Sequence, residues 1–274
     1  MIKSPYIKCL LLVLLLIVFN ASAESKATLH KFAGYEMGYG TFSFDEKLDH
    51  KIVFPVANLT AGLAYKRFSY VLNLSGSLSD ADISEEEQLG HGSRRDLDFT
   101  VGYQINKKIS AFVGYKDGAS KLTLSHRDPA ATDAIPGGTE EYNQQGLYAG
   151  VNLNWAFKNA GKLAFSVAYA QLDVVNRMVA DEIYKLSSGD EFDFDDINSD
   201  STGTSRGFSY TLNYTLPIKG SLLFRARLKI NQYKQDVSGQ QLNGDTASTT
   251  IIHYEFEDVT ERSTMLLVGV TKVF

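Results

Sequence analysis

Apolar and polar residues alternate along most of the chain after residue 30. Alternation with a period of two predicts β-strands in which one face is apolar and the other polar. In each segment one set of positions holds large aliphatic and aromatic residues, and the other holds Gly, Ser, Thr, Asn or charged residues. Ten segments show this pattern: 33–39, 59–65, 68–74, 97–103, 109–115, 147–157, 163–169, 208–216, 222–230 and 266–274.

A soluble β-sandwich also alternates, so the connections between strands have to distinguish it from a barrel. Short links at 66–67, 104–108, 158–162 and 217–221 take turns with long links at 45–57, 76–95, 116–145, 171–206 and 231–263. Short turns at one end and long loops at the other are typical of an antiparallel up-and-down transmembrane β-barrel, so the expected fold class is all-β.

Aromatic residues cluster at both ends of the predicted strands. Tyr65, Phe68, Tyr103, Trp155, Phe157, Tyr214 and Phe274 stand at the short-turn end, and Tyr39, Tyr115, Tyr169 and Phe208 at the loop end. Amphipathic rings favour the boundary between lipid and water, so two such bands support the membrane barrel.

The number of strands must be even if both termini lie on the same side of the membrane, and ten is the expected count. Residues 119–126 and 249–256 also alternate. They could extend neighbouring strands beyond the membrane, which the Ile251-Ile252 doublet favours, or they could be further spanning strands. Eight and twelve strands therefore stay open as alternatives.

The first 23 residues have the order of a secretory signal peptide. Lys3 and Lys8 give the segment a positively charged start, and an apolar run from Cys9 to Phe19 follows. Ala21-Ser22-Ala23 is a small-x-small cleavage site. Eleven apolar residues reach only about 16 Å as a helix, too short for a hydrocarbon core of about 30 Å. The predicted domains are thus a signal peptide at 1–23 and one barrel at 24–274.

The chain ends in TMLLVGVTKVF, which alternates and closes on an aromatic residue. This end resembles the terminal strand of Gram-negative outer-membrane β-barrel proteins, with Lys272 where an apolar residue is more usual. The resemblance is to the class and to no single family. It implies a location in the cell outer membrane, contact with outer-membrane lipids and lipopolysaccharide, and insertion by the barrel-assembly machinery. A monomer is expected.

Composition excludes several other classes. A pI of 5.6 argues against a nucleic-acid partner, and a single cysteine excludes a disulfide scaffold and a structural zinc cage. The long links hold 28 acids and 12 bases, whereas the short turns hold seven bases and no acid. The acidic run at 190–200 lacks the spacing of a calcium loop, so no metal and no cofactor are expected.

Charged residues on the polar face of the strands are the candidate lumen lining. Arg225, Arg227 and Lys229 are spaced by two, and Glu36 and Asp98 are inward acids that could pair with them. The three bases could form an internal salt-bridge plug or a basic track for anions. The leading functional hypothesis is a narrow porin-like channel for small anionic solutes. The alternative is a closed structural or adhesive barrel that presents acidic surface loops.

A rim hydrolase is the third hypothesis. Omptin-type proteases are similar in strand number and use paired acids with an Asp-His couple, for which Asp96-Leu97-Asp98 and His253 would be the candidates. Lipid A deacylases are small barrels with a His/Ser couple, and here Ser125-His126 has the reverse order. We therefore expect no catalytic residues and a protein that is not an enzyme.

Overall fold

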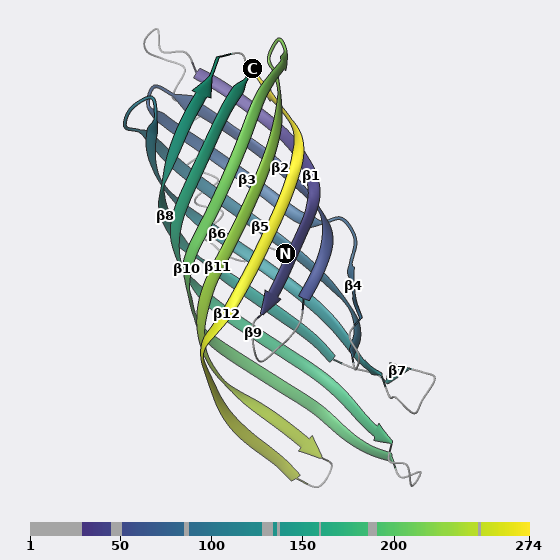
Figure 1. Ribbon diagram of the computed structural model, residues 1–274. Helices are drawn as coiled ribbons and strands as arrows, with labels where there is room; N and C mark the ends of the chain where they lie inside the picture. The colour runs from purple at the N-terminus through teal and green to yellow at the C-terminus, as the bar shows by residue number, and fades with distance from the viewer. Residues whose placement is uncertain are drawn as a thin grey trace.

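The computed structural model describes residues 29–44, 51–84, 88–127, 134–135, 138–158, 160–185, 191–245 and 248–274 (Figure 1). The predicted signal peptide at 1–23 and the first residues of the predicted barrel domain lie outside these ranges. Among the described residues, no helix is long and apolar enough to cross a membrane.

The strands form one closed antiparallel barrel. Its elements are β1 (Leu29–Phe44), β2 (Lys51–Tyr65), β3 (Phe68–Ser77), β4 (Ala81–Ser84), β5 (Gln88–Gln104), β6 (Ile109–Arg127), β7 (Ala134–Ile135), β8 (Gly138–Phe157), β9 (Gly161–Lys185), β10 (Glu191–Lys219), β11 (Leu222–Asp245) and β12 (Ser248–Val273). Pairing of β1 with β12, from Phe32 opposite Val273 to Phe44 opposite Glu261, closes the ring. Closure leaves no strand edge inside the lipid, which a membrane sheet requires.

Ten strands form the ring, as predicted, and two short strands lie at its rim. The ring runs β1, β2, β3, β5, β6, β8, β9, β10, β11 and β12. Strand β4 pairs only with β5, and β7 only with β6, so neither is a spanning strand. Residues 119–126 and 249–256 extend β6 and β12 without a break, which confirms extension over extra spanning strands.

The predicted long loops are mostly strand, which corrects the expected boundaries. Strand β9 continues to Lys185, and β10 begins at Glu191, so the expected loop at 171–206 is largely a paired hairpin. In Figure 1, β9 to β12 extend past the other strands at the end away from the C-terminus. The sequence predicted the end of each strand where its apolar face ends. Hydrogen bonds between neighbouring strands do not need lipid contact, so the strands continue beyond that point.

The outer face of the barrel is apolar and carries both aromatic bands. Met37, Val113 and Leu266 are among its exposed side chains, with Leu266 59% accessible. Phe68 packs on Tyr103 near the short turns, and Tyr169 packs edge-on against Phe208 near the loops. An exposed apolar belt of this extent is what a lipid environment covers.

Candidate functional site

The interior of the barrel holds the polar faces of the ten strands, and its ion pairs form three groups: a lower cluster, a central pair and an upper cluster. The lower ionic cluster, nearer the short turns, consists of Glu36, Arg225 and Arg227. Glu36 is 1% exposed and lies 3.3 Å from Nε of Arg225 and 2.9 Å from an Nη of Arg227. One carboxylate thus faces two guanidinium groups.

A glycine on the strand between the partners makes room for this cluster. In the sheet register Glu36 of β1 and Arg225 of β11 both stand opposite Gly269 of β12. A Cβ on Gly269 would meet the Tyr35 carbonyl oxygen at 2.0 Å, so no side chain fits there. The absence of that side chain lets Arg225 of β11 reach a carboxylate two strands away.

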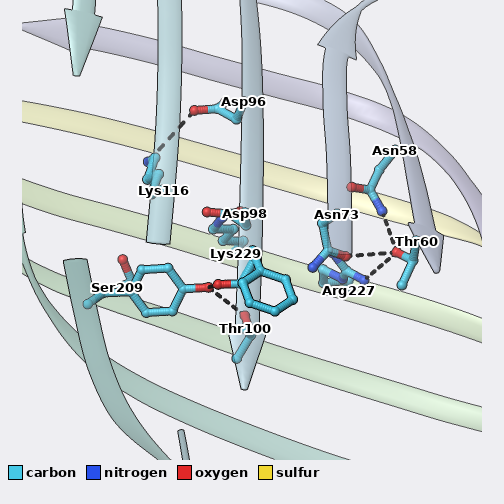
Figure 2. A network of polar contacts seen from close by, with 12 residues as sticks. Asn58, Thr60, Asn73, Asp96, Asp98, Thr100, Lys116, Ser209, Arg227 and Lys229 are labelled. Carbon is cyan, nitrogen blue, oxygen red and sulfur yellow. Dashed lines mark hydrogen bonds and ion pairs between the residues drawn. The ribbon is translucent and has the colours of Figure 1, made fainter. Parts of the chain in front are cut away.

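A belt of hydrogen bonds continues the lower cluster across β2 and β3. The Asn58 amide donates to Glu36 at 2.7 Å and to the Thr60 hydroxyl at 2.9 Å, and Thr60 donates to Asn73 at 2.8 Å. Arg227 reaches the same Asn73 and Thr60, at 3.4 and 3.5 Å (Figure 2). The network therefore joins β11 to β3 through the interior.

Lys229 and Asp98 form a direct ion pair within the barrel. Nζ of Lys229 donates to Oδ2 of Asp98 at 2.7 Å, and the two side chains lie beside each other in Figure 2. Tyr148 and Thr100 share a hydrogen bond below this pair, and Tyr148 also donates to the Phe99 carbonyl. The pair and the tyrosine narrow the middle of the lumen.

The upper ionic cluster lies nearer the loops and consists of Arg94, Asp96, Lys116 and Glu261. Arg94 donates two hydrogen bonds of 3.0 Å to Asp96, a forked geometry that is among the stronger ion pairs. Lys116 lies 3.8 Å from Asp96, and Arg94 lies 3.9 Å from Glu261. All four side chains are nearly inaccessible to solvent.

Neutral donors complete the surroundings of Glu261. Tyr142, Gln144 and Gln235 donate to its carboxylate at distances between 2.9 and 3.1 Å. Tyr142 and Gln144 come from β8 and Gln235 from β11, so this carboxylate on β12 ties distant parts of the ring together. These donors satisfy the hydrogen-bonding capacity of a carboxylate that has no access to water.

An apolar plug fills the lumen on the loop side. It is one cluster of buried side chains: Phe42, Ile52, Phe54, Val56, Ala81, Leu122, Tyr142, Val174, Met265 and Leu267. These residues come from six strands of the ring, β1, β2, β6, β8, β9 and β12, and from β4 at its rim. Phe54 and Phe42 are 0% and 1% exposed, so the cluster packs across the lumen rather than lining an open one.

The structure places all five sequence-predicted lumen residues in these contacts. Glu36 joins Arg225 and Arg227, and Asp98 joins Lys229. Sequence reasoning missed Arg94, Lys116, Glu140 and Glu261 as interior residues, because it assigned them to loops. The continued alternation of Arg94, Asp96 and Asp98 on one face of β5 is the signal that could have located the first of them.

The residues considered for catalysis do not come together. Asp96 and Asp98 are buried in ion pairs inside the barrel. His253 is exposed and pairs in register with Gln240, eleven residues along β11 from Lys229, or roughly 36 Å at about 3.3 Å per residue. The side chains of Ser125 and His126 lie outside those that the structure describes.

One Asp-His couple that the sequence did not suggest does form. Nδ1 of His91 lies 3.1 Å from Asp82, but the two side chains are 65% and 86% exposed. Their neighbours Ala81 and Gly92 face the interior, so the couple lies on the outer surface. Among the described residues, no group of three or more His, Cys, Asp or Glu side chains could hold a metal ion. The acidic run at 190–200 has mostly undescribed side chains.

No protein-family model matches the chain, and no curated protein matches it. Among solved structures, the outer membrane protease OmpT from Escherichia coli is similar, with a TM-score of 0.58 and 8% identity over 92% of this chain and 99% of that one. The translocator domain of autotransporter NalP from Neisseria meningitidis gives 0.44 and 11% over 97% and 95%. The β domain of the Bordetella autotransporter BrkA gives 0.37 and 9% over 90% and 99%.

At such low identity these likenesses establish the fold alone. The chain has the architecture of a Gram-negative outer-membrane β-barrel, which confirms the class-level resemblance of its C-terminal strand, and no specific family is identified.

Proposed function

We propose that this protein is a closed barrel of the outer membrane that serves as a rigid base for its long outer hairpins. This is the structural or adhesive alternative that the sequence left open, taken in preference to a channel for anionic solutes. The observation that carries it is the apolar plug, a single buried cluster with members from seven strands.

The charges inside the barrel support the same proposal. Among the described residues the interior holds five bases and five acids: Arg94, Lys116, Arg225, Arg227, Lys229, Glu36, Asp96, Asp98, Glu140 and Glu261. A track for anions needs an excess of cations exposed to water along the whole pore. Here most of the cations are held by carboxylates, some of them across the lumen, which favours a rigid plug.

The outer hairpins are ordered, paired strands that project beyond the ring. Strands β9 and β10 remain paired as far as Lys185 opposite Glu191, and β11 and β12 as far as Asp245 opposite Ser248. Val175, Val179 and Ile251 expose more than two fifths of their surface on these hairpins. Ordered strands that project beyond a closed barrel offer a preformed surface for adhesion or for contacts within the envelope.

Conductance in planar lipid bilayers tests the proposal. Purified wild-type protein should produce no single-channel steps, because the plug blocks the passage of water and ions through the lumen. A Phe42→Ala/Phe54→Ala/Leu122→Ala variant removes bulk from the plug and should raise ion leakage. Phe208→Ala, on the outer face, is the matched control and should stay silent. Reproducible steps from the wild type would contradict the closed barrel.

The role of the hairpins needs a separate measurement. Replacing residues 238–255 of β11 and β12 by a tight turn should leave a heat-modifiable gel band, because the ring pairs of β12 with β1 end at Glu261. The same variant should lose surface-dependent attachment or envelope integrity in cells. If the heat-modifiable band were lost instead, the hairpin would be needed for the barrel to fold, which would contradict its role as a presented surface.

A further inference from the structure

A cavity of about 260 Å³ lies in the interior beside the lower ionic cluster and the Lys229–Asp98 pair. Its wall includes three bases of β11, Arg225, Arg227 and Lys229, and polar side chains such as Asn152, Ser166 and Thr211. The volume is near the lower end for small-molecule pockets, about 300 Å³. It therefore suits a ligand of only a few heavy atoms.

The cavity is accessible from the short-turn end. Interior side chains there, such as Ser69, Asn152 and Asn213, are partly exposed, whereas interior side chains on the loop side, such as Gln144 and Ser205, are almost fully buried. The apolar plug closes the other end. The result is a vestibule, open to one side and closed to the other.

Charge is not balanced at the wall of this vestibule. Lys229 is neutralised by Asp98, and in the upper cluster Arg94 and Lys116 face Asp96 and Glu261. In the lower cluster a single carboxylate, that of Glu36, serves both Arg225 and Arg227. One positive charge is therefore in excess at this wall, since the fifth interior acid, Glu140, lies on the loop side with Asn176. A cation that shares its carboxylate in a low-dielectric interior attracts a counter-ion.

Arg225 is the arginine with donors to spare. Arg227 uses its guanidinium on Glu36, Asn213, Asn73 and Thr60. Arg225 forms an ion pair with Glu36 through Nε at 3.3 Å and donates one hydrogen bond from an Nη to Asn213 at 3.4 Å, so at least three of its five N–H donors are available among the described contacts. Its side chain is 19% exposed and lines the cavity.

Further donors lie on the strands around the cavity. The Asn152 carbonyl oxygen accepts from Ser166 at 3.2 Å, which leaves the Asn152 amide hydrogens available among the described contacts. The Asn213 oxygen likewise accepts from both arginines, so its amide hydrogens are also available among the described contacts. The wall is therefore rich in donors around one uncompensated cation, the pattern that recognises oxyanions.

From this geometry we propose that the vestibule binds a small oxyanion, a phosphate or a carboxylate, which enters from the short-turn end and makes its main contact with Arg225. The site is a pocket that is open at one end and not a pore. It is a proposal separate from the closed-barrel function, and each of the two can be tested without the other.

Isothermal titration of the full-length protein in lipid nanodiscs tests the site, with inorganic phosphate and succinate as separate probes in low-salt buffer. Saturable binding of at least one probe is expected, and which one binds distinguishes phosphate from carboxylate. Arg225→Gln should weaken binding at least tenfold, and Asn152→Ala several-fold. Lys219→Gln removes an exposed cation from the neighbouring turn and should bind like the wild type.

Heat-modifiable gel mobility shows that each variant is folded. Absence of binding by the folded wild type to both probes would overturn the site. So would unchanged affinity in both Arg225→Gln and Asn152→Ala, or a loss in Lys219→Gln as large as that in Arg225→Gln, which would indicate general surface attraction. A conducting wild type that still binds would reject the closed barrel and leave the anion site standing.

Discussion

Lys229 and Asp98 stand five strands apart in a ring of ten, yet Nζ and Oδ2 are 2.7 Å from each other. The ion pair therefore spans the diameter of the barrel. The interior is narrow enough at this level for two side chains to close it, which is consistent with the small lumen of a barrel of this size.

Breaking this pair from one side should destabilise the barrel. Lys229→Met leaves Asp98 as a poorly solvated carboxylate, so we expect the free energy of unfolding to fall by about 2 kcal/mol. In a double-mutant cycle, Lys229→Met/Asp98→Asn should lose less free energy of unfolding than the two single variants lose together. Urea unfolding in lipid vesicles, followed by Trp155 fluorescence, measures these free energies.

An exposed ion pair provides the control for that cycle. Lys121 and Glu141 lie 3.7 Å apart with more than half of each side chain accessible. Their coupling should be below about 1 kcal/mol, since solvent screens exposed pairs. If the Lys229–Asp98 cycle gave no larger coupling than this, the pair would not hold the barrel together.

The apolar plug should contribute as much stability as a soluble core. Phe54 is fully buried, so Phe54→Ala should lower the free energy of unfolding by roughly 3–5 kcal/mol. Phe208→Ala, whose ring is 47% exposed on the outer face, should cost clearly less. Equal losses in the same vesicle unfolding assay would mean that the plug is loosely packed.

Packing of the plug also depends on a glycine that faces it. A Cβ on Gly40 would come within 2.8 to 3.0 Å of the Phe54 ring, which is too close. Gly40→Ala should therefore destabilise the barrel by about 1–3 kcal/mol. Because the obstacle is a side chain, Gly40→Ala/Phe54→Leu should recover part of the loss, whereas a backbone obstacle would allow no such rescue.

Whether the sequence predicts a strand of this barrel depends on whether its residues face lipid or water. The ten spanning segments were predictable because lipid selects apolar side chains at every second position, as at Leu266, Val268 and Val270. The same rule fails above the lipid. Both faces of β9 become mixed after Gln171, so a continuing strand resembled a loop.

The interior was predictable only in part. Arg225, Arg227 and Lys229 stood out because their charges interrupt a spanning strand. Glu261 and Lys116 lay beyond the apolar segments and could not be distinguished from solvated loop charges. The plug was not foreseen at all, because Phe42, Phe54 and Leu122 are apolar on a face expected to be polar, and only the three-dimensional closure shows that they meet.

Asp236, on the hairpin of β11 and β12, should make that hairpin sensitive to acid. A backbone N–H from Asp258 donates to its carboxylate at 3.2 Å, and Arg206 donates at 2.6 Å. The Asp258 hydrogen bond, followed by the Arg206 contact, lowers the pKa of Asp236 below its ordinary value. The Asp236–Asp258 hydrogen bond lies at a β-bulge, where the register between β11 and β12 shifts from Gln235 to Val237. Asp258 has a left-handed backbone there, with a φ of 57°.

Because the pKa is lower in the folded hairpin than in the unfolded chain, this contact stabilises the hairpin fully above the ordinary carboxyl pKa and is lost as the pH falls through the lowered value. Carbon-detected NMR titration should place the midpoint of Asp236 below that of a free aspartate. Arg206→Gln should move it only part of the way back, since the Asp258 N–H remains. In Asp236→Asn, protection of the Asp258 amide, corrected for intrinsic exchange, should no longer depend on pH in the acid range. A wild-type midpoint at or above the ordinary value would show that the hydrogen bond does not hold the bulge.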